Sequence, residues 1–166
     1  LKAAGADVIQ IDESYMQANP KEADAFGVAA INRALDGIEG RTVVHLCFGY
    51  AYVVADKPEG YSFLPQLDAC AAEAISIEAA QPNLDPVILE KLPNKKILYS
   101  VINLGTQEVE MAELVANRLR GALAHTSADR LIAAPDCGMK YLPRDVAFGK
   151  LNALVEGAAM VRDELN

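Results

Sequence analysis

The chain has 166 residues, of which 52% are hydrophobic and 23% charged, a composition typical of a folded globular domain and unlike that of a disordered chain. Fifteen basic and 23 acidic residues give a formal net charge of −8, which argues against a nucleic-acid partner because nucleic-acid-binding proteins present a basic face. No apolar run reaches the ~18 residues that cross a bilayer, and no signal peptide is visible, so we expect a cytoplasmic protein with no membrane partner.

Five short apolar runs predict β-strands, and helical patterns separate them. The strands are expected at residues 7–12, 42–47, 74–78, 97–103 and 130–134. Apolar residues three and four apart predict helices at 23–35, 64–72, 109–123 and 143–164. Asp85 and Pro86 are typical of the cap and first turn of a further short helix. This alternation of strands and helices predicts an α/β fold with a parallel sheet.

The spacing of the strands favours an eight-stranded (β/α) barrel, the TIM barrel. The polar residues that end the strands are 33, 33, 25 and 33 residues apart, namely Asp12, His45, Glu78, Asn103 and Asp136. A barrel of eight strand–helix units in ~250 residues averages about 31 residues per unit. If the fold is this barrel, residues 1–166 form one domain that holds five of the eight units, and three units are missing. A complete five-stranded open sheet also fits this length.

Four strand-end residues are candidate metal ligands. His45 and Cys47 are two apart on one strand, so their side chains point to the same face. Glu78 ends an apolar strand, where a carboxylate is costly unless it is paired or bound to a metal. Cys137 directly follows the last strand. One nitrogen, two sulfurs and one oxygen form a set that suits zinc. Each residue alone also has an ordinary structural interpretation, as a buried histidine, a buried thiol or a salt-bridged carboxylate.

Four motifs in this order resemble the catalytic barrel of the cobalamin-independent methionine synthases. They are Gln10-Ile11-Asp12-Glu13, His45-Leu46-Cys47, Ile75-Ser76-Ile77-Glu78 and Pro135-Asp136-Cys137-Gly138. The resemblance covers nearly the whole chain and implies that its units are the last five of the barrel. It also implies a zinc ion held by His45, Cys47, Glu78 and Cys137. By the same resemblance, Asp12 binds the amino group of homocysteine as a catalytic and substrate-binding residue, and Glu13 lies beside it in the substrate site.

The resemblance further implies a zinc-dependent methyltransferase of methionine biosynthesis. In this family the zinc binds the homocysteine sulfur, which takes the methyl group of 5-methyltetrahydrofolate. Because only a thiolate attacks, coordination to zinc activates the sulfur. We expect the five units alone to be inactive, and we expect the missing N-terminal half of the barrel, or a second copy, to be needed.

Two departures from the family pattern leave other functions open. The family has Asp-Glu-Pro after the first of these strands, whereas this chain has Asp12-Glu13-Ser14. The methionine synthases of the family carry a histidine where this chain has Asn103, and an amide cannot shuttle a proton. The alternatives are alkyl transfer to another thiol, such as coenzyme M in an epoxide-opening reaction, and a non-catalytic incomplete barrel.

The remaining polar and sulfur residues are expected to be structural. Cys70 lies in a helical pattern and is predicted to be core, and His125 is predicted to lie at the surface. Tyr50, Tyr52 and Tyr61 surround the loop after Cys47. They are interpreted as an ordinary loop cluster, with one wall of a substrate pocket as the alternative.

Overall fold

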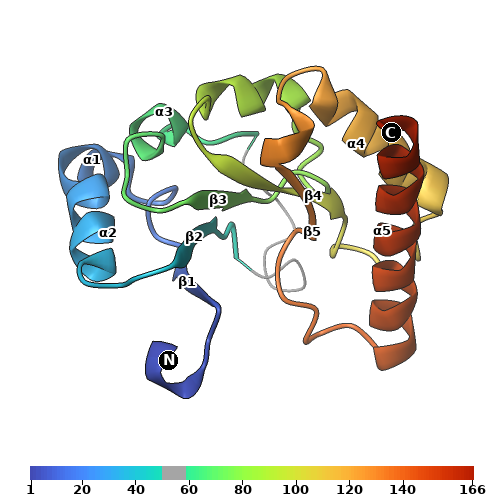
Figure 1. Ribbon diagram of the computed structural model, residues 1–166, viewed down its shortest axis with the longest axis horizontal. Coiled ribbons are helices and arrows are strands. Elements are labelled where there is room, and N and C mark those ends of the chain that lie inside the picture. Colours follow the sequence, from blue (N-terminus) through green and yellow to red (C-terminus); the bar gives the residue numbers. More distant parts are fainter. Residues whose placement is uncertain (50–58) are drawn as a thin grey trace.

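The computed structural model describes residues 1–49 and 59–166 as one parallel sheet with helices along one side (Figure 1). The strands follow the order β1-β2-β3-β4-β5, and each pairs in parallel with the next. Their bounds are Val8–Glu13, Arg41–Leu46, Ala74–Ile77, Lys96–Ile102 and Leu131–Pro135. A doubly wound sheet reverses its strand order part-way, which this sheet does not. The expected barrel units are therefore confirmed, and the open-sheet alternative is wrong.

Helices connect successive strands and form an arc around the outer face of the curved sheet (Figure 1). They are α1 Pro20–Glu22, the π-helical segment Ala23–Gly27, α2 Val28–Leu35, α3 Leu64–Leu67, the 3-10 helix Pro86–Lys91, α4 Ala112–Leu123 and α5 Arg144–Glu164. Two short 3-10 turns lie at Lys2–Ala4 and Ala128–Arg130. None of these helices, in the part of the chain that is described, is both long and apolar enough to cross a membrane.

The short helix at residue 85 begins as the sequence predicts, but the helix predicted at 64–72 is much shorter. The Asp85 carboxylate accepts the backbone N–H of Val87 at 3.0 Å and so caps the first turn. In contrast, α3 ends at Leu67, and the chain continues as a turn. Cys70 lies in this turn and is buried, as the sequence predicts. The N–H of Ala71 is taken by the Asn32 side chain at 2.7 Å rather than by a helical carbonyl. The apolar pattern there reports burial against the sheet and not a continuous helix.

The two faces of the sheet have different chemistry because successive side chains alternate. The outward-facing side chains pack under the helices and form the hydrophobic core; Val44, Ile75 and Ile97 among them are fully buried. The inward-facing side chains include Asp12, which pairs in register with His45, and His45 pairs in turn with Ser76. The polar residues therefore gather on the inner face, at the carboxyl ends of the strands.

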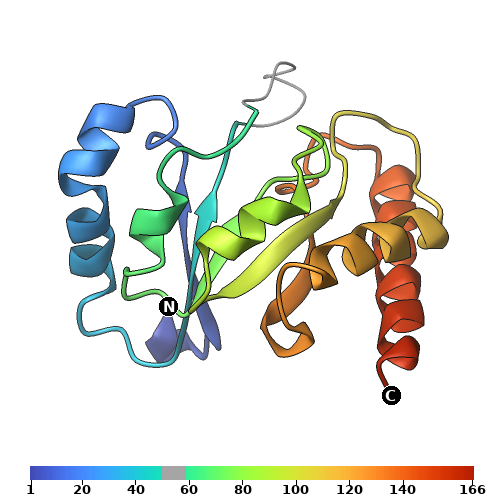
Figure 2. The ribbon, with the colours of Figure 1, turned by 90° about the horizontal axis from the view of Figure 1, so that it is seen from above.

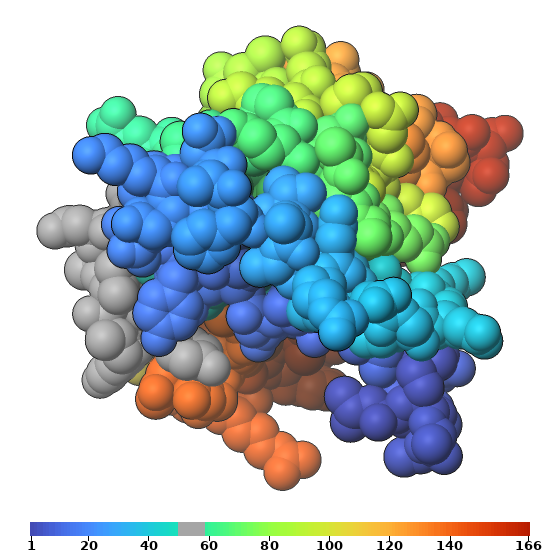
Figure 3. Space-filling model, turned by 90° about the vertical axis from the view of Figure 1, so that its left-hand side faces the viewer, coloured from blue at the N-terminus to red at the C-terminus, as the bar shows by residue number. Residues whose placement is uncertain are grey.

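The inner face is open to solvent at both edge strands. Val8 on β1 is 45% exposed and Ile132 on β5 is 43% exposed, although both are apolar and point inward. Figure 3 shows the molecule hollowed between the N-terminal residues and the segment that follows β5. This sheet therefore has the curvature of a barrel wall, with its two edges unpaired in the described part of the chain.

Helices α4 and α5 cross in close contact beside β5 (Figure 2). Gly157 makes this approach possible, because a Cβ there would lie 2.6 Å from the carbonyl oxygen of Ala112 and 2.6 Å from Cβ of Val115. Any larger residue at this position would force the two helices apart. The contact fixes the last helix against the core and so sets the position of the segment that precedes it.

Candidate metal centre

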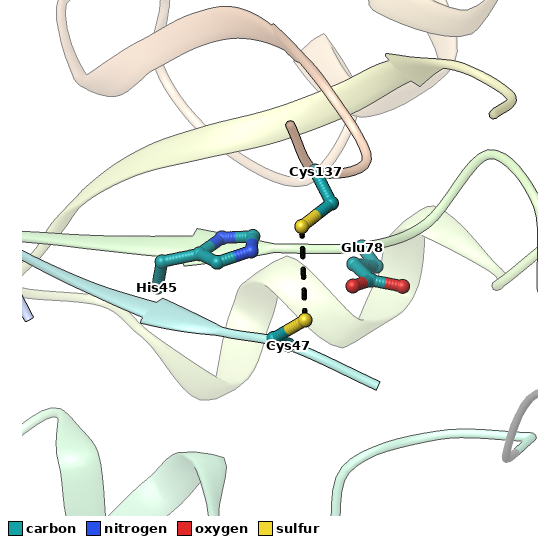
Figure 4. A group of neighbouring side chains, drawn as sticks. All are labelled: His45, Cys47, Glu78 and Cys137. Carbon is teal, nitrogen blue, oxygen red and sulfur yellow. Dashed lines mark hydrogen bonds between the residues drawn. The ribbon is translucent and has the colours of Figure 1, made fainter. Parts of the chain in front are cut away.

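The four predicted ligands lie together at the carboxyl ends of the strands (Figure 4). His45 lies on β2, and Cys47 follows the same strand. Glu78 follows β3, and Cys137 follows β5. One ligand atom from each of the four side chains lies within 4.8 Å of the others. Three strands that are far apart in sequence therefore bring one nitrogen, two sulfurs and one carboxylate oxygen to a common point.

His45 is held with one ring nitrogen directed at this point. Its side chain is buried, and Nδ1 lies 2.9 Å from the hydroxyl oxygen of Ser76 on the neighbouring strand. The other nitrogen, Nε2, is buried and has no hydrogen-bond partner among the described residues. Burial lowers the pKa of His45, but contacts with Cys47 and with the nearby carboxylates outweigh burial and hold the pKa above its usual value. A buried nitrogen without a partner is costly unless a ligand or an ion completes it.

The two thiols face one another, with 3.7 Å between Sγ of Cys47 and Sγ of Cys137 (Figure 4). Their shared hydrogen bond raises the pKa of the Cys47 thiol to about 12 and lowers the pKa of the Cys137 thiol. The backbone N–H of Gly49 also donates to Sγ of Cys47 at 3.3 Å. The two thiols are therefore electrostatically coupled, as expected of side chains that share one site.

Glu78 is a buried carboxylate, with 1% of its surface exposed. Its Oε1 accepts the backbone N–H of Phe48 at 3.0 Å, which ties the end of β3 to the residue after Cys47. Its own backbone N–H donates to the hydroxyl of Tyr61 at 2.9 Å, and that hydroxyl donates to the carbonyl of Leu46 at 3.0 Å. The position of Glu78 is thus fixed from both the β2 and the β3 sides.

Tyr61, Ser76 and Asp136 support the ligands, and the sequence did not predict these roles. Tyr61 lies in the loop after Cys47, where it is buried and stacks on Phe48 with ring centroids 4.2 Å apart. Burial raises its pKa well above the usual value, which keeps the hydroxyl a donor. Tyr50 and Tyr52 lie outside the described residues. The one signal in the sequence was position: each of these three side chains lies within two residues of a predicted ligand or on the loop after Cys47.

Asp12 and Glu13 end β1 beside the cluster but make different contacts. Asp12 is exposed, and its Oδ1 accepts the side-chain N–H of Gln10 at 2.7 Å. The Glu13 carboxylate accepts the backbone N–H groups of Tyr15 at 2.9 Å and Met16 at 3.0 Å. Asp12 is therefore exposed on the inner face and bonded to Gln10, whereas Glu13 holds the turn after β1.

Asn103 directly follows β4. Its Oδ1 accepts the N–H of Gly105 at 2.7 Å, and its backbone N–H donates to the carboxylate of Glu110 at 2.8 Å. Asn103 thus shapes the loop after β4. The second histidine, His125, is partly exposed and pairs with Glu90 at 2.7 Å, at a surface position as expected.

The geometry of the four ligand groups fits a zinc ion. Two sulfurs that each lie about 2.3 Å from one zinc at a tetrahedral angle are about 3.8 Å apart, and the two cysteine sulfurs are 3.7 Å apart. The partnerless Nε2 of His45 faces the same point. One imidazole, two thiols and one carboxylate are also the donor types that zinc prefers.

The comparisons with known proteins agree with this geometry. The sequence model of the family described as "Cobalamin-independent synthase, Catalytic domain" matches residues 1–160. Curated relatives named methionine synthase include those of Sulfurisphaera tokodaii and Thermococcus kodakarensis, each 34% identical over 99% of this chain and 46% of their own length. The chain therefore spans about half the length of these relatives.

Solved structures show the same arrangement of strands and helices. A B12-independent methionine synthase from Shewanella sp. W3-18-1, solved in complex with selenomethionine, superposes with a TM-score of 0.92 and 36% identity over 99% of this chain and 51% of that chain. A putative vitamin-B12 independent methionine synthase from Listeria monocytogenes superposes with a TM-score of 0.67 and 16% identity over 98% of this chain and 49% of that chain, a likeness of fold alone.

Proposed function

Because this chain belongs to the cobalamin-independent methionine synthase family, we propose that it forms the zinc site of an enzyme that transfers a methyl group from 5-methyltetrahydrofolate to the thiol of homocysteine. The observation that supports this most is the convergence of His45, Cys47, Glu78 and Cys137 on one point at the carboxyl ends of the strands. Active sites of (β/α) barrels lie at this end. The product would be methionine.

The residues of the site fall into two groups, one that would hold a metal ion and one that would bind the substrate. His45, Cys47, Glu78 and Cys137 would hold a zinc ion, with Ser76 fixing the imidazole through Nδ1. When bound, zinc would supply the Lewis acidity that keeps a substrate thiol ionised at neutral pH. Glu78 would be held in the site by the Phe48 N–H, which would keep its carboxylate hydrogen-bonded if a substrate sulfur were also to bind.

Asp12 is proposed to bind the substrate amino group, with Glu13 beside it. Asp12 lies in register with His45 on the adjacent strand, and its carboxylate is exposed on the inner face. An ammonium group near the cluster would therefore lie within reach of the Asp12 carboxylate. Glu13 contributes by fixing the turn that follows Asp12 through two backbone hydrogen bonds.

We further propose that three more strand–helix units complete the barrel. The unpaired edges of β1 and β5 expose the inward-facing Val8 and Ile132, and exposed strand edges are normally covered. Helix α5 also presents an exposed apolar stripe of Phe148, Leu151 and Val155, whose spacing places the three on one side of the helix. Such surfaces suit burial against further units of the same fold.

Asn103 favours a second candidate function, alkyl transfer to a different thiol. The family's histidine at this place is interpreted as a proton-transfer group. The Asn103 amide, which accepts the N–H of Gly105, cannot transfer a proton. A thiol such as coenzyme M, alkylated by an epoxide, is the specific alternative. The zinc site and its four ligands would be the same in both reactions.

A thiol-alkylation assay on the intact, zinc-loaded protein tests these proposals. We expect methionine from homocysteine and 5-methyltetrahydrofolate, loss of at least about 100-fold in rate for Cys47→Ser, and near-parent activity for the matched control Cys70→Ser, because Cys70 lies in the core away from the cluster. Unchanged melting of Cys47→Ser would agree with a catalytic metal and not a structural one.

Other outcomes of the same assay separate the candidates. Product from coenzyme M and an epoxide alone would favour the second function. Full activity in Cys47→Ser would contradict both. The 166-residue chain by itself is expected to give no product, and activity should appear when the first three units of the Shewanella relative are co-expressed with it. Activity of the chain alone would contradict barrel completion.

A further inference from the structure

Asp136 is a buried carboxylate, 1% exposed, that lies directly before Cys137. Its Oδ1 accepts the backbone N–H groups of Ala79 and Ala80, both at 3.0 Å, together with the hydroxyl of Ser100. Its Oδ2 accepts the N–H of Gln81 at 2.8 Å. One carboxylate thus receives three consecutive backbone N–H groups and one hydroxyl.

These bonds join two strands that are not neighbours in the sheet. Ala79, Ala80 and Gln81 directly follow the candidate ligand Glu78 on the β3 side, whereas Asp136 belongs to the β5 side. Strand β4 lies between them and contributes Ser100. The backbone N–H of Asp136 also donates to the carbonyl of Ile102 on β4 at 3.1 Å. The carboxylate therefore spans the sheet from the end of β3 to the end of β5.

The hydrogen bonds of Asp136 connect the segments that carry two of the four candidate ligands. Glu78 and Cys137 come from strands separated by β4, so no direct β-ladder sets their spacing. Hydrogen bonds to an ionised acceptor are stronger than neutral ones, and in a buried place they resist rearrangement. The segment after Glu78 and the residue before Cys137 are consequently joined through one side chain.

We propose that Asp136 is a positioning residue, which holds Glu78 and Cys137 at the spacing a metal ion needs before the ion binds. This inference rests on the proposed zinc site. Asp136 itself donates no ligand atom to the cluster, and it acts through the backbone N–H groups that it binds. Groups that orient ligands in this way typically change metal affinity by roughly 10- to 100-fold when they are replaced.

Asp136→Asn in the intact protein tests the proposal with a minimal change. An asparagine oxygen at the Oδ1 position keeps the three bonds from Ala79, Ala80 and Ser100, while its NH2 group then faces the N–H of Gln81 without an acceptor. We expect faster hydrogen exchange at the Gln81 amide and zinc affinity lower by roughly 10- to 100-fold in competition with a chromophoric chelator. In the cobalt-substituted protein, the ligand-field absorption should change shape or intensity.

Two further variants complete the test. Asp68→Asn is the matched control, because Asp68 also accepts a backbone N–H, that of Asn94 at 2.9 Å, but lies on a loop before β3 at the other end of the strands. It should leave zinc affinity and the cobalt spectrum unchanged. Ser100→Ala removes a single partner of Asp136, and a smaller loss of affinity is expected there. If Asp136→Asn does not fold, the zinc affinity of Ser100→Ala provides the test instead.

The possible results separate this inference from the zinc site on which it rests. Parent-like zinc affinity and cobalt spectra in both Asp136→Asn and Ser100→Ala would overturn the positioning role and leave the zinc site standing. A parent protein that takes up no zinc would contradict the proposed function. The positioning role is then decided without metal, by the rate at which diamide oxidises Cys47 and Cys137 to a disulfide. A changed rate in Asp136→Asn supports it, and an unchanged rate overturns it.

Discussion

Two opposite charges are buried together beside the loop that follows β4. Lys150 on α5 has no exposed surface, and its ammonium group donates to Glu110 Oε2 at 2.9 Å and to the carbonyl of Asn103 at 2.9 Å. It also donates to the carbonyl of Glu108. The other oxygen of Glu110 accepts the backbone N–H of Asn103. The pair therefore ties α5 to the end of β4.

Lys150→Met should destabilise the protein by about 3 kcal/mol or more, because it leaves the buried Glu110 carboxylate without its main partner. Arg118 lies 3.9 Å from Glu110 and compensates only in part. Urea unfolding measures the loss. The double variant Lys150→Met with Glu110→Gln removes the uncompensated charge and should be more stable than Lys150→Met alone. A double variant that is less stable than the single one would contradict the charge-balance account, and would show that the Glu110 carboxylate stabilises the fold through the Asn103 N–H and Arg118 even without the lysine.

The four candidate ligands were predictable from the sequence, whereas the residues that hydrogen-bond to them or to their strands were not. His45 and Cys47 share a face because of strand alternation, and Glu78 and Cys137 follow from the order of motifs on strand ends. The structure brings all four together, and their binding of zinc stays a prediction. Ser76 and Tyr61 act through hydrogen bonds over 31 and 17 residues of sequence, and a hydroxyl in a strand or a loop carries no local pattern that indicates such a partner.

At the scale of elements, the strands were predicted more closely than the helices. The strand predicted at 42–47 is Arg41–Leu46, and that predicted at 74–78 is Ala74–Ile77, because buried parallel strands are short continuous apolar runs. The helix predicted at 23–35 begins earlier, at Pro20, and passes through a π-helical segment at Ala23–Gly27. Apolar periodicity reports which face is buried and is insensitive to one extra residue in a helical turn.

Gly157→Ala is expected to destabilise the α4–α5 contact by about 1–3 kcal/mol, since the added methyl group overlaps the carbonyl oxygen of Ala112 and Cβ of Val115. This overlap outweighs the gain in helix propensity of about 1 kcal/mol. Gly121→Ala in α4 is the matched control: its Cβ would meet only Cγ of Pro86, at 3.7 Å, so it should be neutral or stabilising. Thermal unfolding measures the stability of both variants. Equal changes in stability for the two substitutions would contradict the close-packing account.

For the whole molecule, strand order decided between the two folds that the sequence allowed. Residue spacing alone fits five units of a barrel or a complete open sheet, because both alternate strands with helices at similar intervals. Sequential order with helices on the outer face leaves the inner face concave, so the ends of β2, β3 and β5 meet around one point. Distant tertiary pairing, and not local pattern, therefore determines whether Glu78 and Cys137 reach His45.

X-ray absorption at the zinc edge, on the intact protein purified with stoichiometric zinc, tests the central claim most directly. The account predicts one zinc per chain with two sulfur ligands at about 2.3 Å and nitrogen or oxygen ligands at about 2.0–2.2 Å. Cys137→Ser should reduce the sulfur count to one. A first shell without sulfur, or a sulfur count that is unchanged in Cys137→Ser, would contradict zinc binding by His45, Cys47, Glu78 and Cys137.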